Sequence, residues 1–388
     1  MPHTDLGADL LKLRDVARDI AKQVLAPNAH EVDQSAAWPA DGMEALAQAG
    51  LMGLHVPLRL GGHEQGMLAL SVVTEELGRS CGSTAMCFGM HSIAAKVLAA
   101  KATAEQEERF LRPIARGRHI TSLALSEPGT GAHFFLPRAT FEVQGDDYIL
   151  SGEKSFVTNG GHADSYVVSA IPPGGETDPG AFTCIAVEAD TPGLEWRPAW
   201  NGFGMRGNSS RPLGFKGVVV PSRNLLGAEG DQIWFVFEVI APYFLTAMAG
   251  VYLGIARAAL ETAIEHLKSR RHSHTGETLS NIPVLWHEVA EAWTEVEATR
   301  QLVRHAARLG DAGSEGATRA LFAAKARVAK TVNTVTETAM ILMGGRGYAE
   351  NSQVARLHRD ARAANVMSPT THLLQSWLGR SLLDMPLL

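Results

Sequence analysis

Cysteine is scarce in this sequence, and its spacing points neither to disulfides nor to a metal. Cys81, Cys87 and Cys184 are an odd number, and no Cys-x-x-Cys pair occurs among the 388 residues. This usage argues against a disulfide framework and against a structural zinc site. We therefore expect a reduced, cytoplasmic protein without a metal in its site.

Runs of positive charge and long apolar stretches are also missing. No run of Lys or Arg exceeds two residues and the formal net charge is −6, so nucleic-acid binding has no support. No uninterrupted apolar stretch reaches the ~18 residues of a membrane span, and we expect no membrane insertion. Asp5, Asp9 and Asp15 lie among the first apolar residues, which is typical of an amphipathic helix rather than of a signal or transit peptide.

What is present divides the chain into three blocks. Residues 1–118 repeat apolar positions at helical spacing. Residues 119–228 alternate short runs rich in Val, Ile, Thr and aromatics with turn dipeptides, which predicts an antiparallel β domain. Residues 229–388 hold long Ala-rich amphipathic stretches. The expected fold is a multidomain α+β chain, with helices near 40–50, 66–79, 83–100, 104–115, 238–269, 283–309, 314–343, 352–362 and 369–383.

Four motifs follow one another along these blocks. Residues 125–131 (LSEPGTG) come directly after a predicted strand, and their glycines let the backbone approach an anionic ligand. Residues 151–161 (SGEKSFVTNGG) place an aromatic ring and a hydroxyl at a strand end, where they could face a flat heterocycle. Residues 204–210 (GMRGNSS) and 343–348 (MGGRGY) are Gly-rich turns. Each motif alone is as easily an ordinary turn, hairpin or helix C-cap.

In this order the four motifs resemble the acyl-CoA dehydrogenase family, and the resemblance covers essentially the whole chain. It implies an N-terminal helical domain, a middle antiparallel β-barrel-like domain and a C-terminal four-helix bundle. It also implies an FAD-dependent oxidoreductase that dehydrogenates an acyl-CoA or acyl-carrier-protein thioester between its α and β carbons. The expected partners are an electron-transfer flavoprotein and further copies of the chain, because family members are usually homotetramers with FAD between subunits.

The resemblance assigns the contacts around the flavin ring. Ser126, together with the backbone of Leu125, corresponds to the flavin pyrimidine edge. Thr158 corresponds to a Thr that bonds the flavin near N5. Phe156 replaces the usual Trp against the ring, and a stacking face survives that change.

It also assigns residues to the rest of FAD. Gly131 and Ala132 correspond to the pyrophosphate, with Ala132 in place of the usual Ser. Arg270 corresponds to an Arg that reaches the FAD of a neighbouring subunit, and Thr370 to a Thr near the phosphate end. Gly344 and Gly345 match a conserved turn of the family, although the Gln shortly before them has become Ile341.

The carboxylate base of the family is missing. The usual Glu follows shortly after an Asp-Ala-Lys segment, and here Ser368 takes that position after residues 360–362 (DAR). The alternative position on an earlier helix falls at about Phe244. Ser368 has two interpretations: it caps a helix that starts at Pro369, or it hydrogen-bonds a substrate or a flavin–oxygen adduct.

Three functions therefore stay open at the level of the sequence. The first is dehydrogenation with another base, for which Glu238 and Asp231 are candidates. The second is N-, S- or C-oxidation with oxygen and flavin supplied by a reductase, because related flavin monooxygenases also lack the Glu. The third is a non-catalytic flavin-binding subunit. The remaining candidate side chains for acid–base chemistry are His91, His372 and Tyr243.

Overall fold

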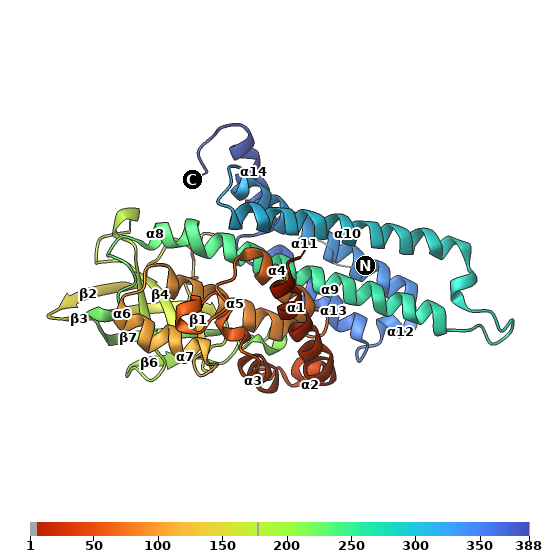
Figure 1. Cartoon of the computed structure of the whole chain (residues 1–388), viewed down its shortest axis with the longest axis horizontal. Coiled ribbons are helices and arrows are strands. Elements are labelled where there is room, and N and C mark those ends of the chain that lie inside the picture. Colours follow the sequence, from red (N-terminus) through yellow and green to blue (C-terminus); the bar gives the residue numbers. More distant parts are fainter. Residues whose placement is uncertain (1–5, 177, 388) are drawn as a thin grey trace.

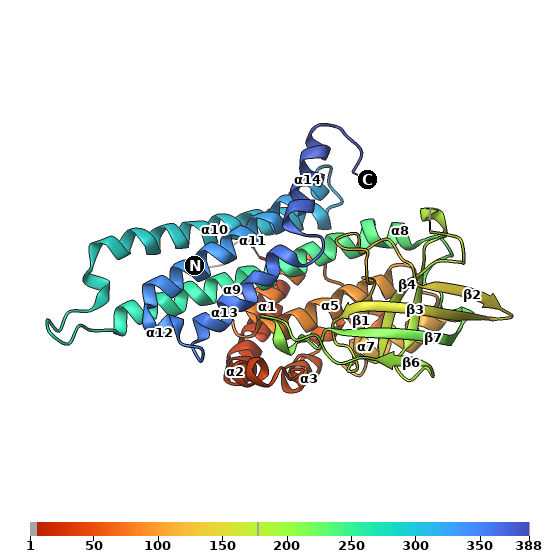
Figure 2. The ribbon, with the colours of Figure 1, turned by 180° about the vertical axis from the view of Figure 1, so that it is seen from behind.

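The computed structural model describes residues 6–176 and 178–387, and it confirms the predicted order of helices, strands and helices. The molecule is elongated, with the strands at one end and the turn between α9 and α10 at the other (Figure 1). The view from behind shows the first helices of the chain beside the middle of the long C-terminal helices, while the last helices before the strands lie next to the strands (Figure 2).

The first block is helical throughout, as its apolar spacing predicts. Pro27 does not end the first helix: a π-helical turn, Ala21–Leu25, joins α1 to α2, and Pro27 lies in the first turn of α2, where its missing N–H is tolerated. The helices are α1 (Ala8–Ile20), α2 (Ala26–Ser35), α3 (Ala40–Gln48), α4 (Met67–Gly78), α5 (Gly82–Ala100), α6 (Ala104–Gln106) and α7 (Arg112–Ala115).

The middle block forms two sheets, ordered β1-β4-β5 and β2-β3-β7-β6, around a core of its own. The expectation of purely antiparallel pairing is wrong at one place, because β1 runs parallel to β4, with Thr121 opposite Ser165. The strands are β1 (Thr121–Ala124), β2 (Thr140–Gln144), β3 (Asp147–Val157), β4 (Ser165–Ala170), β5 (Thr183–Glu188), β6 (Leu194–Trp196) and β7 (Arg211–Pro221).

The last block packs α9, α10, α11 and α13 together. One continuous helix, Gln232–Ser269, is apolar and long enough to cross a membrane, contrary to the sequence-based expectation, but 94% of its apolar window is buried among the other elements. That burial is typical of a core helix. The helices are α8 (Gln232–Trp234), α9 (Ala241–Ser269), α10 (Pro283–Asp311), α11 (Ala317–Met343), α12 (Gly345–Tyr348), α13 (Gln353–Val366) and α14 (Thr371–Leu382).

Helix α4 of the first block packs directly on α9 and α10 of the last. Buried Glu75 on α4 accepts hydrogen bonds from Arg257 on α9 at 2.5 Å and from Arg300 on α10 at 3.0 Å. The neighbouring guanidinium groups hold the pKa of Glu75 below its usual value against the opposing effect of burial. Since an unpaired buried carboxylate is costly, this cluster fixes how the two helical blocks meet.

Candidate functional site

A pocket lies where the β domain, α5, the start of α9 and the segment before α14 meet. Its cavity volume is about 60 Å³. Four of the sequence-predicted positions, Leu125, Ser126, Phe156 and Ser368, share this pocket with Phe244, the alternative base position. The complete lining is Met90, Leu123, Leu125, Ser126, Phe134, Ser155, Phe156, Ile240, Phe244 and Ser368.

The turn at Ser126 is held by a buried ion pair. Lys154 of β3 donates to the Leu125 carbonyl at 3.3 Å and to the Glu127 carboxylate at 2.5 Å, while Glu127 accepts from the backbone N–H groups of Arg138 and Ala139. Burial lowers the pKa of Lys154, and the Glu127 charge opposes that effect. The motif residues Glu127 and Lys154 therefore position the turn rather than contact a ligand.

Phe156 is displayed by a local distortion of β3. The register with β7 shifts between Lys154 and Val157, and Phe156 adopts a φ of +53°, which is rare for a bulky residue. Its ring is 58% exposed and lies edge-on to Trp200 with centroids 5.4 Å apart. Strained backbone that exposes an aromatic ring is typical of a ligand-binding position.

A short backbone link joins this strand to the Ser126 turn. The N–H of Ser155 donates to the carbonyl of Ser126 at 2.7 Å. Two residues beyond Phe156, Thr158 is almost fully buried, and its carbonyl accepts from the Ser122 hydroxyl at 2.7 Å. The backbone that carries Phe156 and the turn that carries Ser126 are thus fixed relative to one another.

The segment carrying Ser368 is anchored by a lysine that the sequence analysis did not identify. The Nζ of Lys325 on α11 donates to the carbonyls of Ala364 at 2.9 Å, Met367 at 3.3 Å and Pro369 at 2.9 Å. Lys325 is fully buried, and burial lowers its pKa to about 8. In the sequence, Lys325 lies on an apolar helix face and has no acidic residue one turn away. That pattern could have indicated a buried lysine whose partners lie elsewhere in the chain.

Ser368 itself is not a helix cap, so that interpretation is wrong. The N-cap of α14 is Thr370, whose hydroxyl accepts from the N–H of Leu373 at 3.3 Å, and Pro369 lies before the helix. The Ser368 side chain is instead half-buried at the pocket wall. Thr370, predicted to lie near the flavin phosphates, is thus also the residue that starts α14.

No ionisable side chain lines the described pocket. Asp231 accepts from Lys101 and from the Ala228 N–H, both at 2.8 Å, and the Lys101 hydrogen bond lowers its pKa. Glu238 is exposed and contributes nothing to the lining. The two carboxylates proposed as substitute bases therefore lie outside the pocket.

The other titratable candidates also lie outside it. His91 is fully buried behind Met90; its ring nitrogens contact the Met52 carbonyl at 3.0 Å and the Thr121 N–H at 3.1 Å. Burial lowers the pKa of His91 to about 4, so the ring is neutral near pH 7. His372 is exposed on the first turn of α14. Burial raises the pKa of Tyr243, whose ring lies edge-on to His55.

The predicted FAD residues fall into two groups. Gly131 and Ala132 lie on the turn after β1; Gly131 has a φ of +57°, with no atom within 4 Å of an added Cβ. Arg270 follows the end of α9, Gly344 follows the end of α11 and Gly345 begins α12, all toward the end of the molecule away from the strands (Figure 1). One copy of the chain therefore does not bring all the predicted FAD contacts together.

The residues at the pocket fit a flavin. A planar ring system needs an aromatic face and hydroxyl or backbone groups along its edge, and the exposed Phe156, Ser126 and the 125–127 backbone supply them. The open Gly131 turn leaves the backbone accessible to a phosphate.

Comparisons with known proteins agree with this geometry. Family models for the acyl-CoA dehydrogenase N-terminal, middle and C-terminal domains match residues 8–118, 122–218 and 246–383. Cyclohex-1-ene-1-carbonyl-CoA dehydrogenase of Geobacter metallireducens is 34% identical over 95% of this chain and 96% of its own length.

Two solved structures are similar along their whole length. Butyryl-CoA dehydrogenase from Megasphaera elsdenii is 27% identical with a TM-score of 0.92, covering 97% of this chain and 99% of that one. A chain described with the electron transferring flavoprotein of Acidaminococcus fermentans is 29% identical with a TM-score of 0.93, covering 99% and 100%. With three family models matched in order, and with Ser126, Phe156 and Ser368 brought together in one pocket, this chain belongs to the acyl-CoA dehydrogenase family of FAD-dependent oxidoreductases.

Proposed function

We propose that the protein dehydrogenates an acyl-CoA thioester between its α and β carbons. The observation that carries the proposal is the pocket that joins Ser126, Phe156 and Ser368 across three parts of the chain. FAD, when bound, supplies the acceptor for the β-hydride. The apolar walls exclude water, and the serine hydroxyls are donors available to the thioester carbonyl.

The pocket restricts how the α-proton leaves. Ser368 occupies the position of the family's base, and a serine without a basic partner removes a proton poorly near neutral pH. We therefore infer that Ser368 orients the thioester, that the hydrogen-bonded carbonyl acidifies the α-proton, and that this proton passes to a water at the mouth of the pocket, where Phe156 is exposed.

Anaerobic mixing of the FAD-loaded protein with acyl-CoA thioesters tests the proposal. Loss of flavin absorbance with at least one thioester is the expected result. If no thioester reduces the flavin, while dithionite does so fully, the dehydrogenase proposal fails. Dithionite is the control that shows the flavin to be bound and competent.

A second function is favoured by the lack of a carboxylate in the pocket. A monooxygenase that receives reduced flavin from a reductase needs no base for an α-proton, and a hydroxyl such as Ser368 can hydrogen-bond an oxygen adduct. This alternative predicts no flavin reduction by thioesters, together with oxygen uptake and an oxidised product once a reductase is added.

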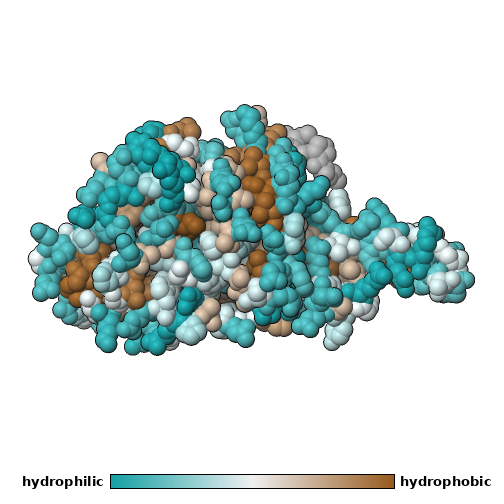
Figure 3. Space-filling model, turned by 90° about the horizontal axis from the view of Figure 1, so that it is seen from below, coloured by the Kyte–Doolittle hydropathy of each residue, from teal (hydrophilic) through white to brown (hydrophobic). Residues whose placement is uncertain are grey.

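The assembly follows from the two groups of predicted FAD residues. Because Arg270 and Gly344 lie away from their own pocket, they contact FAD only if a second copy presents them. We propose a homotetramer, and apolar surface in the middle of the face in Figure 3 leaves room for subunit contacts. Light scattering tests it: a mass of one chain would contradict the proposal.

We further propose a cytoplasmic protein that passes its electrons to an electron-transfer flavoprotein. The support is the similarity to the Acidaminococcus fermentans chain. Reduced protein should be reoxidised by a purified electron-transfer flavoprotein faster than by oxygen. Equal or slower reoxidation would count against that partner.

A further inference from the structure

The inner wall of the pocket is apolar and comes from four parts of the chain. Met90 belongs to α5, Leu123 to β1 and Phe134 to the loop after β1. Ile240 ends the π-helical turn before α9, and Phe244 lies in the first turn of α9. Each of these side chains is less than 10% exposed. The wall is therefore part of the protein core and not a mobile surface loop.

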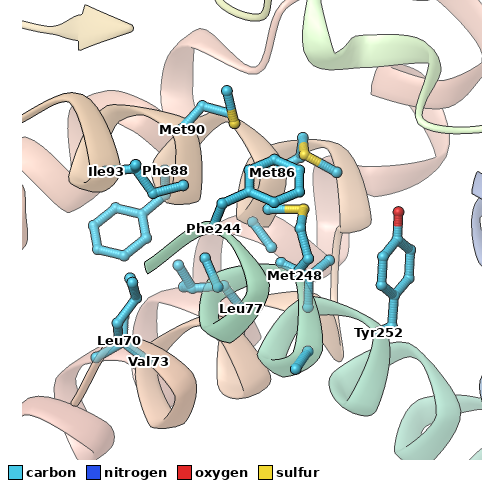
Figure 4. Packing of buried hydrophobic residues seen from close by; sticks show 14 of the residues in the cluster. Leu70, Val73, Leu77, Met86, Phe88, Met90, Ile93, Phe244, Met248 and Tyr252 are labelled. Atoms are coloured by element: carbon cyan, nitrogen blue, oxygen red, sulfur yellow. The ribbon is translucent and has the colours of Figure 1, made fainter. Parts of the chain in front are cut away.

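Core side chains fill the space behind this wall in the part of the chain that the structure describes. Met86 and Met248 are fully buried next to Phe244 (Figure 4). Helices α5 and α9 are in direct contact there, since a Cβ on Gly89 would lie 3.4 Å from the side chains of both Ala247 and Met248. The pocket ends at Phe244 because a second layer of core side chains supports that ring.

The size of the cavity limits the acyl group. The whole pocket, including the part beside Ser126 and Phe156 that is assigned to the flavin edge, has a volume of about 60 Å³. One water needs roughly 10–15 Å³ by this measure, so the acyl group has space for at most on the order of four to six non-hydrogen atoms. A fatty acyl chain of eight or more carbons exceeds that space unless the core opens, and forcing extra methylenes into a packed core is unfavourable.

From these observations we propose that Phe244 and Met90 close the pocket and restrict the substrate to a compact acyl group, one that ends within a few carbons of the thioester carbonyl. The proposal rests on the acyl-CoA dehydrogenation proposed above. Phe244 occupies the alternative position for the family's base. At that position this chain has an aromatic ring that closes the pocket and no carboxylate.

The test is the rate of anaerobic flavin reduction for a series of CoA thioesters, namely butanoyl, isobutanoyl, cyclohexanecarbonyl, hexanoyl and octanoyl. For the unmodified protein we expect the fastest of the first three to exceed octanoyl-CoA by at least about 100-fold, since a few misplaced methylenes suffice for such a difference. Phe244→Ala and Met90→Ala, on two different helices, should each raise the octanoyl-to-butanoyl ratio at least about tenfold.

Phe88→Leu is the matched control. Phe88 belongs to the same buried cluster and to the same helix as Met90, but it does not line the pocket. It should loosen the packing of the same cluster while leaving the chain-length ratio unchanged. If Phe88→Leu shifts the ratio as much as Phe244→Ala, general loosening of the core explains the effect and the assignment of Phe244 is wrong.

The outcomes separate this inference from the proposed function. Reduction of the flavin by octanoyl-CoA as fast as by butanoyl-CoA in the unmodified protein overturns the compact pocket but leaves a dehydrogenase. Failure of every thioester overturns the dehydrogenase itself. In that case displacement of a fluorescent CoA thioester by the same series still tests the pocket: equal competition by octanoyl-CoA and butanoyl-CoA would overturn it.

Discussion

At Ser368 the chain offers a hydroxyl where its family supplies a carboxylate, in a segment that Lys325 holds by three carbonyls. The backbone of the segment is therefore held in place, and only the basic side chain is missing. Ser368→Glu should increase the anaerobic flavin-reduction rate with a saturated acyl-CoA by about 100-fold, because a positioned base contributes ~10²–10⁴-fold.

Ser368→Ala is the matched control for this substitution. It removes the hydroxyl without adding a base, and we expect a change of less than about tenfold, because a lone hydroxyl contributes only a hydrogen bond. If Ser368→Glu binds FAD normally and is no faster than the unmodified protein, the segment does not point at the reacting carbon.

A second residue-scale prediction concerns Asp360, which accepts from the Met205 N–H at 2.6 Å. Burial raises its pKa from 3.8 to about 6. The folded state therefore binds the proton more tightly than the unfolded state. Its contribution to stability is fully present below about pH 4 and is lost as pH rises through about 6, on the order of 3 kcal/mol.

Asp360→Asn keeps an oxygen for the Met205 N–H but does not titrate. Its free energy of unfolding, measured by urea denaturation, should therefore lack this decline, and the variant should gain on the unmodified protein between pH 4 and pH 7. A difference between the two proteins that stays constant with pH would show that the Asp360 carboxyl does not titrate in that range.

At the scale of elements, α4 and α9 approach so closely that only glycine fits. A Cβ on Gly250 would lie 2.1 Å from the Thr74 hydroxyl and 2.5 Å from the Ser71 carbonyl. Gly250→Ala must push the helices apart, and we expect the free energy of unfolding to fall by about 1–3 kcal/mol.

Gly379 provides the matched control within helix α14. An added Cβ there meets no atom within 4 Å, so Gly379→Ala should be neutral or stabilise by up to ~1 kcal/mol through helix propensity alone. Chemical denaturation measures both variants. Equal effects of the two substitutions would show that the contact between α4 and α9 is not what makes Gly250 necessary.

The periodicity of apolar residues predicts most of the helices and strands. The sequence predicts only some of the residues that line the pocket. Helical spacing predicts α4, α5 and α9–α11 because each buries one apolar stripe or more. The parallel pairing of β1 with β4 was missed, since their connection includes other strands and no local pattern specifies it.

Within the site, the sequence predicted Ser126, Phe156 and Ser368, because each lies in a segment that resembles a motif of the family. Met90, Phe134 and Ile240 were not identified as pocket residues, because apolar residues that line a pocket look like any other core residue in a sequence. The interpretation of Ser368 as the cap of the last helix was wrong, because Ser368-Pro369 is as good a helix start by sequence as Thr370, which is the actual N-cap.

The last prediction belongs to the whole molecule. If Arg270 binds the FAD of a neighbouring copy, Arg270→Ala alone and Phe156→Ala alone should each lower FAD retention at least about tenfold, because each removes contacts from every site. Both side chains are exposed in a single chain, so neither substitution should weaken the fold.

Co-expression of the two variants then shows whether each FAD site is formed by one chain or shared between two. In a mixed pair, the Phe156→Ala copy still supplies Arg270 to the intact pocket of the Arg270→Ala copy. Random pairing of equal amounts restores about a quarter of the sites, since half the pairs are mixed and one of their two sites is complete. Flavin absorbance per chain measures this directly. If co-expression restores no FAD, Arg270 does not act across a subunit interface, and the two groups of predicted FAD residues do not form one site.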